Sequence, residues 1–304
     1  MDLTDLETAL FEALPEDVEV RFSTGPVEIR HERNATEVVL RNSLCGTSVS
    51  ESFDLVVGAD GLRSSVRRLV FGPDKAYVRD LDAVVAIADM TQPFSGLGPN
   101  DSAALTEVGR SAVVVPLAGV GHCMLFNWRS RDSAEQLRQA PAASLRRAYD
   151  AATGGPLLNQ LFDQYERSQE PYLDSLHQVR MHRWHQGRVA LLGDSAWCMT
   201  LLSGLGASGA LAGAELLGTM LQRHPSDLQG ALTAWQSQMW PFVDYHHRAI
   251  TRTLDALVPR SRAQLILGRA TEVVFNAPIT KSVATKLTTR SRAHTMATLD
   301  VAAP

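Results

Sequence analysis

The alternation of hydrophobic and polar positions predicts short strands, compact buried strands and amphipathic helices along this chain. Leu3, Leu6, Leu10 and Leu14 recur at helical spacing, so the chain is expected to open in a helix. Strand-like alternation follows, in short segments separated by polar turns. These predicted strands cover residues 18–22, 27–30, 38–40 and 48–50.

Two compact apolar runs have the pattern of strands that are buried on both faces. The first covers 54–58, ends at Ala59-Asp60-Gly61 and precedes a predicted helix over 63–70. The second covers 187–192, ends at Gly193-Asp194 and precedes a long helix that is rich in small residues. Open α/β sheets bind ligands at the carboxyl ends of their strands, so both turns are candidate binding elements.

The region between these runs is predicted to be mostly β and then helical. Candidate strands cover 77–79, 82–87, 111–115 and 123–128, and helical spacing covers 131–165. Two or three further helices are expected within 227–285, followed by a loose tail.

The composition of the chain mainly argues against certain partners, targeting segments and metal sites. The chain has 304 residues, is 45% hydrophobic and carries a formal net charge of −4, which does not favour a polyanionic partner. The first residues lack the features of a signal peptide, and no apolar run approaches the roughly 20 residues of a membrane span. Three distant cysteines without a C-x-x-C pair indicate reduced thiols, a cytoplasmic location and no metal site.

Residues 204–209 spell G-x-G-x-x-G, but the simple Rossmann interpretation fails. A Rossmann turn lies directly between a strand and its helix, whereas this strand ends at Leu192, well before Gly204. The glycines instead favour close approach of a flat ligand to a helix N-terminus, where anionic groups are stabilised. Gly209 and Gly213 are expected to let that helix pack tightly. Its predicted apolar stripe is Ala207, Ala210, Leu211, Ala214, Leu217 and Leu221.

Two stretches together resemble class A flavoprotein monooxygenases, the para-hydroxybenzoate hydroxylase-like group. Residues 187–196 (GRVALLGDSA) resemble the second FAD motif of that family, and 54–67 (DLVVGADGLRSSVR) resemble its G-A-D-G-x-x-S-x-V-R motif. The resemblance covers roughly residues 1–250 and implies an α/β fold. It implies a partial, Rossmann-like FAD-binding domain (1–75 and 176–225), an inserted mostly β substrate domain (76–175) and C-terminal helices with a tail (226–304).

The resemblance also implies the cofactors and the residues that bind them. The family's flavin is reduced by NAD(P)H and then activates dioxygen to hydroxylate a small molecule, here expected to be aromatic or polyketide-like. The motifs imply contacts with the ribose or ribityl region, the isoalloxazine and the pyrophosphate. The expected cofactor-binding residues are Asp60, Gly61, Arg67, Gly193, Asp194, Gly204, Leu205 and Gly206. No catalytic side chain can be assigned, because the cofactor carries the difficult chemistry.

Structural roles compete with each of these assignments. Asp60 and Asp194 could simply cap the helices that follow them. Arg67 could lie on a solvated helix face, and Trp197 is expected to pack in the core, as is Trp184. The pair His246-His247 is expected at the surface, since adjacent helical positions point apart. His182 and His185 are expected there as well.

The sequence departs from the family in four ways. The family often has His, Pro and Asp where this chain has Trp197, Leu201 and Gly213. The fourth departure is at the start, where family members have a strand–G-x-G-x-x-G–helix unit that holds the ADP half of FAD. We expect that unit to lie on a separate polypeptide, to be lost by truncation, or to be replaced by another mode of FAD binding. The alternative function is therefore a non-catalytic remnant or partner subunit of a split flavoprotein, and a related reductase or halogenase is a third possibility.

Overall fold

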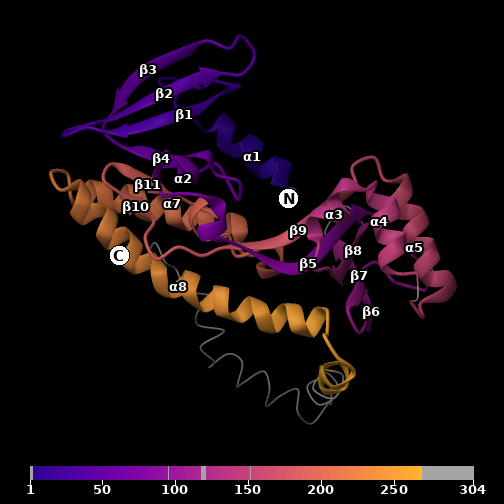
Figure 1. Ribbon diagram of the computed structural model, residues 1–304. Coiled ribbons are helices and arrows are strands. Elements are labelled where there is room, and N and C mark those ends of the chain that lie inside the picture. The colour runs from indigo at the N-terminus through magenta and orange to yellow at the C-terminus, as the bar shows by residue number, and fades with distance from the viewer. Residues whose placement is uncertain (1–2, 95, 118–120, 151, 269–304) are drawn as a thin grey trace. The chain divides into compact units, whose positions relative to one another are not determined.

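The computed structural model describes residues 3–94, 96–117, 121–150 and 152–268 (Figure 1). The chain divides into two compact units, Met1–Val56 and Val57–Pro304, which are described separately. Among the described residues, no helix has both the length and the apolarity that a membrane span requires.

The first unit holds helix α1 (Leu3–Glu12) and an antiparallel sheet with the strand order β1-β2-β3. Its strands are β1 (Thr24–His31), β2 (Thr36–Asn42) and β3 (Ser48–Phe53). Arg30 on β1 lies directly opposite Glu37 on β2, and the two form an ion pair of 3.2 Å. The predicted opening helix and three of the four predicted strands are confirmed.

The strand predicted over 18–22 is wrong, because this segment is irregular. The apolar alternation is present, yet Phe22 is 72% exposed and Val18 and Val20 are exposed too. Arg21 pairs instead with Glu19 and Glu51 at 2.6 Å each. Alternation alone does not make a strand when no neighbouring backbone pairs with the segment.

The second unit begins with a small sheet that carries the two motifs, in the strand order β10-β11-β4. Its strands are β4 (Val56–Gly58), β10 (His185–Gln186) and β11 (Val189–Leu191). Both predicted compact strands exist, and both are shorter than predicted. The expected burial holds for β11, which is buried throughout, but on β4 only Gly58 is buried.

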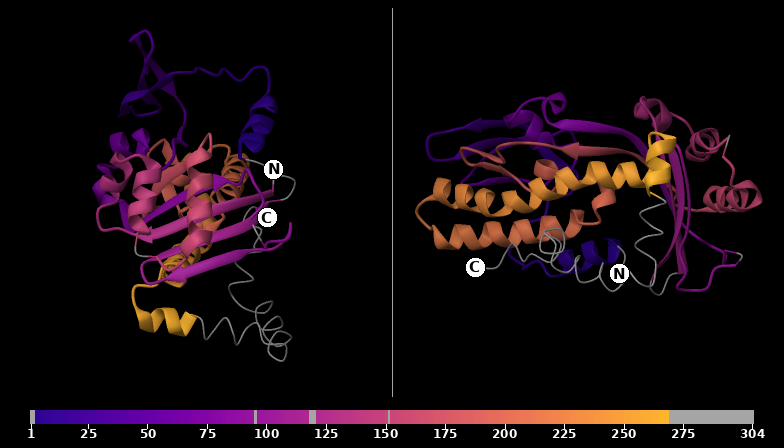
Figure 2. Two further views of the ribbon diagram at one scale, coloured as in Figure 1. Left: turned by 90° about the vertical axis from the view of Figure 1, so that its right-hand side faces the viewer. Right: turned by 90° about the horizontal axis from the view of Figure 1, so that it is seen from below.

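The helices of this part of the second unit follow the two motifs. They are α2 (Ser65–Val70), η1 (Asp74–Ala76), α6 (Asp194–Trp197), η2 (Leu201–Ser203), α7 (Gly206–Arg223) and α8 (Leu228–Leu257). Helices α7 and α8 pack side by side (Figure 2, right). A further helix starts at Arg262, and the predicted tail lies outside the described residues from 269 onward.

Tryptophan rings fill the space between the small sheet and these helices. The ring centroids of Trp184 and Trp197 are 4.6 Å apart, and those of Trp197 and Trp235 are 5.9 Å apart. A Cβ at Gly213 would lie 2.9 Å from the ring of Trp197, so this glycine does allow tight packing, as predicted. The predicted packing roles of Trp184 and Trp197 are also confirmed, since each is at most 1% exposed.

The predicted apolar stripe of α7 is largely wrong. Leu217 is buried as expected, but Leu211 is 41% exposed. The buried residues of α7 are Gly209, Gly213, Leu216, Leu217 and Met220. The helix turns its glycines toward the tryptophans, because only residues without a side chain can approach those rings so closely.

The larger sheet of the second unit has five strands in the order β6-β7-β8-β5-β9. The strands are β5 (Val78–Asp89), β6 (Ala103–Glu107), β7 (Arg110–Leu117), β8 (Gly121–Arg129) and β9 (Tyr172–Val179). The sequence predicted β7 and β8, and it divided β5 into two strands. It did not predict β6 or β9.

The two faces of this sheet pack against different helices (Figure 2, right). Helices α3 (Ser133–Arg138), α4 (Pro141–Ala148) and α5 (Gly155–Arg167) lie on one side, where Phe126 and Trp128 join Tyr149 and Phe162 in the core. On the other face, Val85 and Leu176 pack with Leu254 at the end of α8. Leu202 of η2 also packs there, which connects this face to the second motif.

Candidate functional site

The two motifs meet at one edge of the small sheet. The backbone N–H of Leu192 donates to the carbonyl of Gly58 at 2.9 Å, and the buried hydroxyl of Ser195 donates to the same carbonyl. The turns at Asp60-Gly61 and Gly193-Asp194 follow directly from these positions. Residues more than a hundred positions apart in the sequence therefore lie within one local framework.

Asp60 caps helix α2. Its carboxylate accepts hydrogen bonds from the backbone N–H groups of Ser65 at 2.6 Å and Val66 at 3.1 Å, and from the Ser64 hydroxyl. These bonds satisfy helix N–H groups that have no partner inside the helix. The capping role is therefore real, and the exposed Asp60 side chain retains access to a ligand.

Arg67 is fully buried, with 0% of its surface exposed. Its guanidinium donates to the carbonyl of Ser195 at 2.9 Å, to the carbonyl of Leu62 at 2.5 Å and to the carboxylate of Asp74 at 2.7 Å. Arg67 is therefore neither on a solvated face nor exposed to a ligand. It connects the loop after β4 to the loop after β11, and so positions Asp194 through its neighbour Ser195.

Asp194 is the first residue of α6 and its side chain is exposed. Gly193 precedes it with a φ of 64°, a backbone conformation that favours glycine. Surrounding protein atoms partly desolvate the carboxylate and raise its pKa, although a hydrogen bond with the Cys198 thiol acts in the opposite direction. Asp194 is thus an accessible acceptor whose ionised form the free protein stabilises poorly.

The segment from Thr200 to Gly206 forms an open turn that leads into α7. Thr200 has φ 68° and ψ 157°, a strained conformation for a residue with a side chain, and its hydroxyl accepts the N–H of Leu202. Gly204 is left-handed with φ 65°, and no side chain of the described residues caps the start of α7. A Cβ built at Gly204 or Gly206 would meet no atom within 4 Å.

The start of α7 therefore has no side-chain cap among the described residues, and there is room beside its glycines. The N-terminus of a long helix carries about half a positive charge and unpaired donors. A flat ligand with an anionic edge fits such a surface, since glycine lets the backbone approach it closely.

The sequence did not predict a polar cluster on β9. Asp174 forms a long ion pair of 3.6 Å with Arg63, which follows the Asp60-Gly61 turn. The hydroxyl of Tyr172 donates to Asp174 at 3.3 Å, and burial, together with the negative charge of Asp174, raises the pKa of Tyr172 to about 12. No local pattern predicts this pairing, because β9 itself was not predicted.

The surface location expected for His247 is wrong. This side chain is 8% exposed, and its Nε2–H donates to the carbonyls of Trp197 at 3.1 Å and Cys198 at 3.2 Å. Burial lowers its pKa, which keeps the ring neutral. His247 therefore holds the loop that follows Asp194 from the side of α8. His182 is exposed as expected, whereas His185 is half-buried with a pKa lowered by burial.

Comparison with known proteins identifies relatives over most of the chain. A family model described as "FAD binding domain" matches residues 2–227. "Uncharacterized protein Rv1260" of Mycobacterium tuberculosis (strain ATCC 25618 / H37Rv) is 28% identical over 263 residues, covering 84% of this chain and 67% of that protein. "Monooxygenase CTB7" of Cercospora beticola is 27% identical over 252 residues, covering 80% of this chain and 59% of that protein.

Solved structures share the fold. The crystal structure of the tetracycline destructase Tet(51) is 24% identical and superposes with a TM-score of 0.68. The match covers 88% of this chain and 70% of that one. At this level of identity the likeness establishes the fold, whereas chemistry depends on the residues of the site.

Proposed function

This chain belongs to the FAD-binding domain family of monooxygenase-like oxidoreductases, and on that premise we propose that it is an FAD- and NAD(P)H-dependent monooxygenase. Its proposed substrate is an aromatic or polyketide-like small molecule that it hydroxylates. The observation that carries the proposal is the open backbone at Gly204 and Gly206, together with the accessible carboxylate of Asp194, whose neighbour Gly193 lies against Ala210 of the same helix α7.

The residues present fit a flavin. The unpaired N–H groups at the start of α7 suit the anionic edge of an isoalloxazine, and the empty space over both glycines suits its flat ring. Asp194 would accept a hydrogen bond from a ribose or ribityl hydroxyl. When bound, the flavin supplies electron transfer from NAD(P)H to dioxygen, which no side chain can perform.

The chain's own residues then have binding and positioning roles. Arg67 and Ser195 fix the turn that carries Asp194, and His247 fixes the loop that follows it. The strained Thr200 sets the path of the backbone between that loop and α7. Asp60 and Gly61 lie at the adjacent strand end, where a pyrophosphate or NAD(P)H is proposed to pass.

The proposed substrate class rests on the relatives, and the larger sheet supports the proposed flavin turn. The sheet face against which Leu202 of η2 packs is the face nearest the proposed flavin turn. Its residues Val85 and Leu176 are buried against Leu254 of α8, so the sheet gives the proposed flavin turn a firmly packed apolar support. The name of the tetracycline destructase Tet(51) points to a polycyclic compound as the target of that structural neighbour.

A single methyl group tests the flavin site. Gly206→Ala adds a Cβ that meets no protein atom within 4 Å, and alanine favours helix over glycine. The melting temperature without flavin should stay the same or rise. Affinity for FAD, titrated by the change in flavin fluorescence, should fall at least about tenfold, or ~1.4 kcal/mol, because the methyl occupies the proposed ring position.

Gly218→Ala is the matched control, since Gly218 lies in the same helix and is equally unobstructed. It should keep the wild-type affinity for FAD. Equal FAD affinity in Gly206→Ala and the wild type would refute the proposed flavin position. Failure of the wild-type chain to bind FAD would favour the alternative, a partner subunit of a split flavoprotein.

A further inference from the structure

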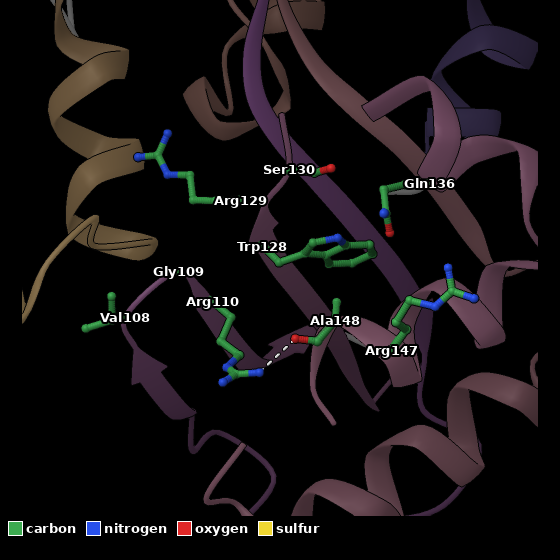
Figure 3. A pocket seen from close by; sticks show the side chains of 9 residues that line it. All are labelled: Val108, Gly109, Arg110, Trp128, Arg129, Ser130, Gln136, Arg147 and Ala148. Carbon is green, nitrogen blue, oxygen red and sulfur yellow. Dashed lines mark hydrogen bonds between the residues drawn. The ribbon is translucent and has the colours of Figure 1, made fainter. Parts of the chain in front are cut away.

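A pocket lies on the helix-covered face of the larger sheet, away from the proposed flavin turn (Figure 3). It has a volume of about 290 Å³ and lies between the β7–β8 pair and helices α3 and α4. Trp128, at the end of β8, belongs to the core that β8 forms with α4 and α5. Leu202 of η2 packs on the opposite face, so the sheet itself separates this pocket from the candidate flavin site.

The pocket contains a buried donor without an acceptor. Trp128 is 3% exposed, and its indole Nε1–H has no hydrogen-bond partner among the described residues. In Figure 3 the indole lies in the middle of the lining side chains, with its nitrogen on the edge turned toward Ser130 and Gln136. A buried donor left unpaired costs free energy, and a bound acceptor would recover it.

The remaining polar groups of the pocket are also mainly donors. Gln136 uses its carbonyl oxygen to accept the Ser144 hydroxyl at 2.7 Å, which leaves its amide N–H groups for the pocket. Arg110 donates to the Ala148 carbonyl at 2.8 Å, a bond drawn in Figure 3, and occupies that acceptor. Among the described residues that line this pocket, none is an aspartate or a glutamate.

Positive charge accompanies these donors. The guanidinium of Arg110 is held by Glu107 at 3.0 Å, and Arg129 is held by Asp255 at 2.6 Å. Arg147 is exposed, and within the described part of the chain its guanidinium has no salt bridge. A planar guanidinium prefers a carboxylate, to which it can donate two parallel hydrogen bonds.

We propose that this pocket binds a small organic carboxylate. The indole N–H of Trp128 and the guanidinium of Arg147 donate to its oxygens, and its apolar body lies against the indole ring and Ala148. The volume of about 290 Å³ is just below the roughly 300–1,000 Å³ typical of ligand sites, which favours a ligand of about one ring. Inorganic phosphate can accept hydrogen bonds from the same donors, but it has no apolar part to contact the indole ring and Ala148.

The test is a titration of the full chain with benzoate, followed by the indole N–H resonances in ¹⁵N-edited NMR. The chain has 5 tryptophans, and Trp128→Phe identifies the resonance of Trp128 by its loss. Benzoate should move that resonance downfield in a saturable manner, as expected for a newly formed hydrogen bond. Benzamide, the neutral isostere, should bind about tenfold more weakly or worse, since charge-assisted hydrogen bonds are about twice as strong.

Calorimetry on two neighbouring variants completes the test. Arg147→Gln should weaken benzoate binding about tenfold or more. Arg146→Gln should not, because Arg146 lies next in the same helix but pairs with Asp163 and Glu166 outside the pocket. Both positions are exposed, so both variants should fold.

Three results would overturn the proposal. One is a Trp128 resonance that does not move at saturating benzoate. Another is equal benzoate affinity in Arg147→Gln and Arg146→Gln. The third is phosphate binding as tight as benzoate binding, which would reduce the pocket to a site for simple anions. None of these readouts depends on FAD or on turnover, so they are independent of the proposed monooxygenase activity.

Discussion

Replacing Arg67 with methionine should strongly destabilise the second unit. Arg67 is the fully buried cation that connects the two motif loops, through the carbonyls of Ser195 and Leu62 and the carboxylate of Asp74. Methionine has a similar length and flexibility, so the substitution removes the charge and the donors without leaving a large cavity.

The magnitude follows from what each former partner loses. Removing one member of a buried ion pair costs about 3–5 kcal/mol, because the other member stays behind uncompensated. Asp74 is 37% exposed in its side chain and can rehydrate, which places the ion-pair contribution at the low end. Two carbonyls also lose a charge-assisted donor, and a buried acceptor left unpaired costs about 1–3 kcal/mol. We therefore expect a loss of about 5 kcal/mol or more in the free energy of unfolding.

The assay is urea unfolding, followed by tryptophan fluorescence, because Trp184, Trp197 and Trp235 pack beside these loops. Arg68→Met is the control. Arg68 binds the same carboxylate at 3.0 Å but is 42% exposed, so its ion pair should contribute only about 0–1 kcal/mol. If both variants lose similar free energy, the assignment of Arg67 as the connection between the loops is refuted.

Three further predictions concern the same unit. Asp194→Asn should weaken FAD binding about tenfold to a hundredfold through loss of a charge-assisted hydrogen bond. Burial raises the pKa of Asp194 above its ordinary value of about 3.9, so stability is lost as pH rises from that value through the raised pKa. The Asn variant should therefore have a higher melting temperature than the wild type without FAD at neutral pH. A lower melting temperature with unchanged FAD affinity would favour a capping role. Gly213→Ala would put a Cβ 2.9 Å from Trp197 and should lower the free energy of unfolding in urea by about 1–3 kcal/mol. Gly218→Ala should not lower it. Equal effects of the two substitutions would refute the close packing of α7. Burial lowers the pKa of His247, so the unfolded chain binds protons more tightly and the free energy of unfolding should fall as pH drops below about 6.5. In His247→Gln the free energy of unfolding should depend less steeply on pH. The pKa of His185 is lowered by burial as well, so His185 should account for part of the pH dependence that remains.

The parts of the fold that the sequence predicted are those with a strong local signal. The strands β4 and β11 are compact apolar runs ending in glycine, and α7 starts at a glycine-rich turn. These signals depend on backbone conformations that few residues other than glycine adopt, as at Gly193 and Gly204. The strand β9 has no such signal, because Asp174, Ser175 and His177 break its apolar pattern with polar side chains that find partners only in the folded unit.

The roles of Arg67 and His247 could not be predicted for a related reason. Both are polar side chains on helices, where a solvated face is the usual location, and both are buried because they hydrogen-bond backbone carbonyls near Asp194. Ser195 and Cys198, whose carbonyls accept these bonds, are far from Arg67 and His247 in the sequence. Periodicity describes how a residue relates to its own helix and carries no information about such distant acceptors.

The features around Asp194 have one property in common, which is that each is unfavourable in the free protein. Burial raises the pKa of the Asp194 carboxyl, Thr200 is strained, and among the described residues no side chain caps the first N–H groups of α7. A fold selected only for stability would correct such defects, since a cap or a relaxed turn is gained by a single substitution. All three lie on the short segment that joins β11 to α7. A ligand that donates a hydroxyl to Asp194 and presents an anionic edge to α7 would relieve two of them at once, which is the physical argument for a flavin at this turn.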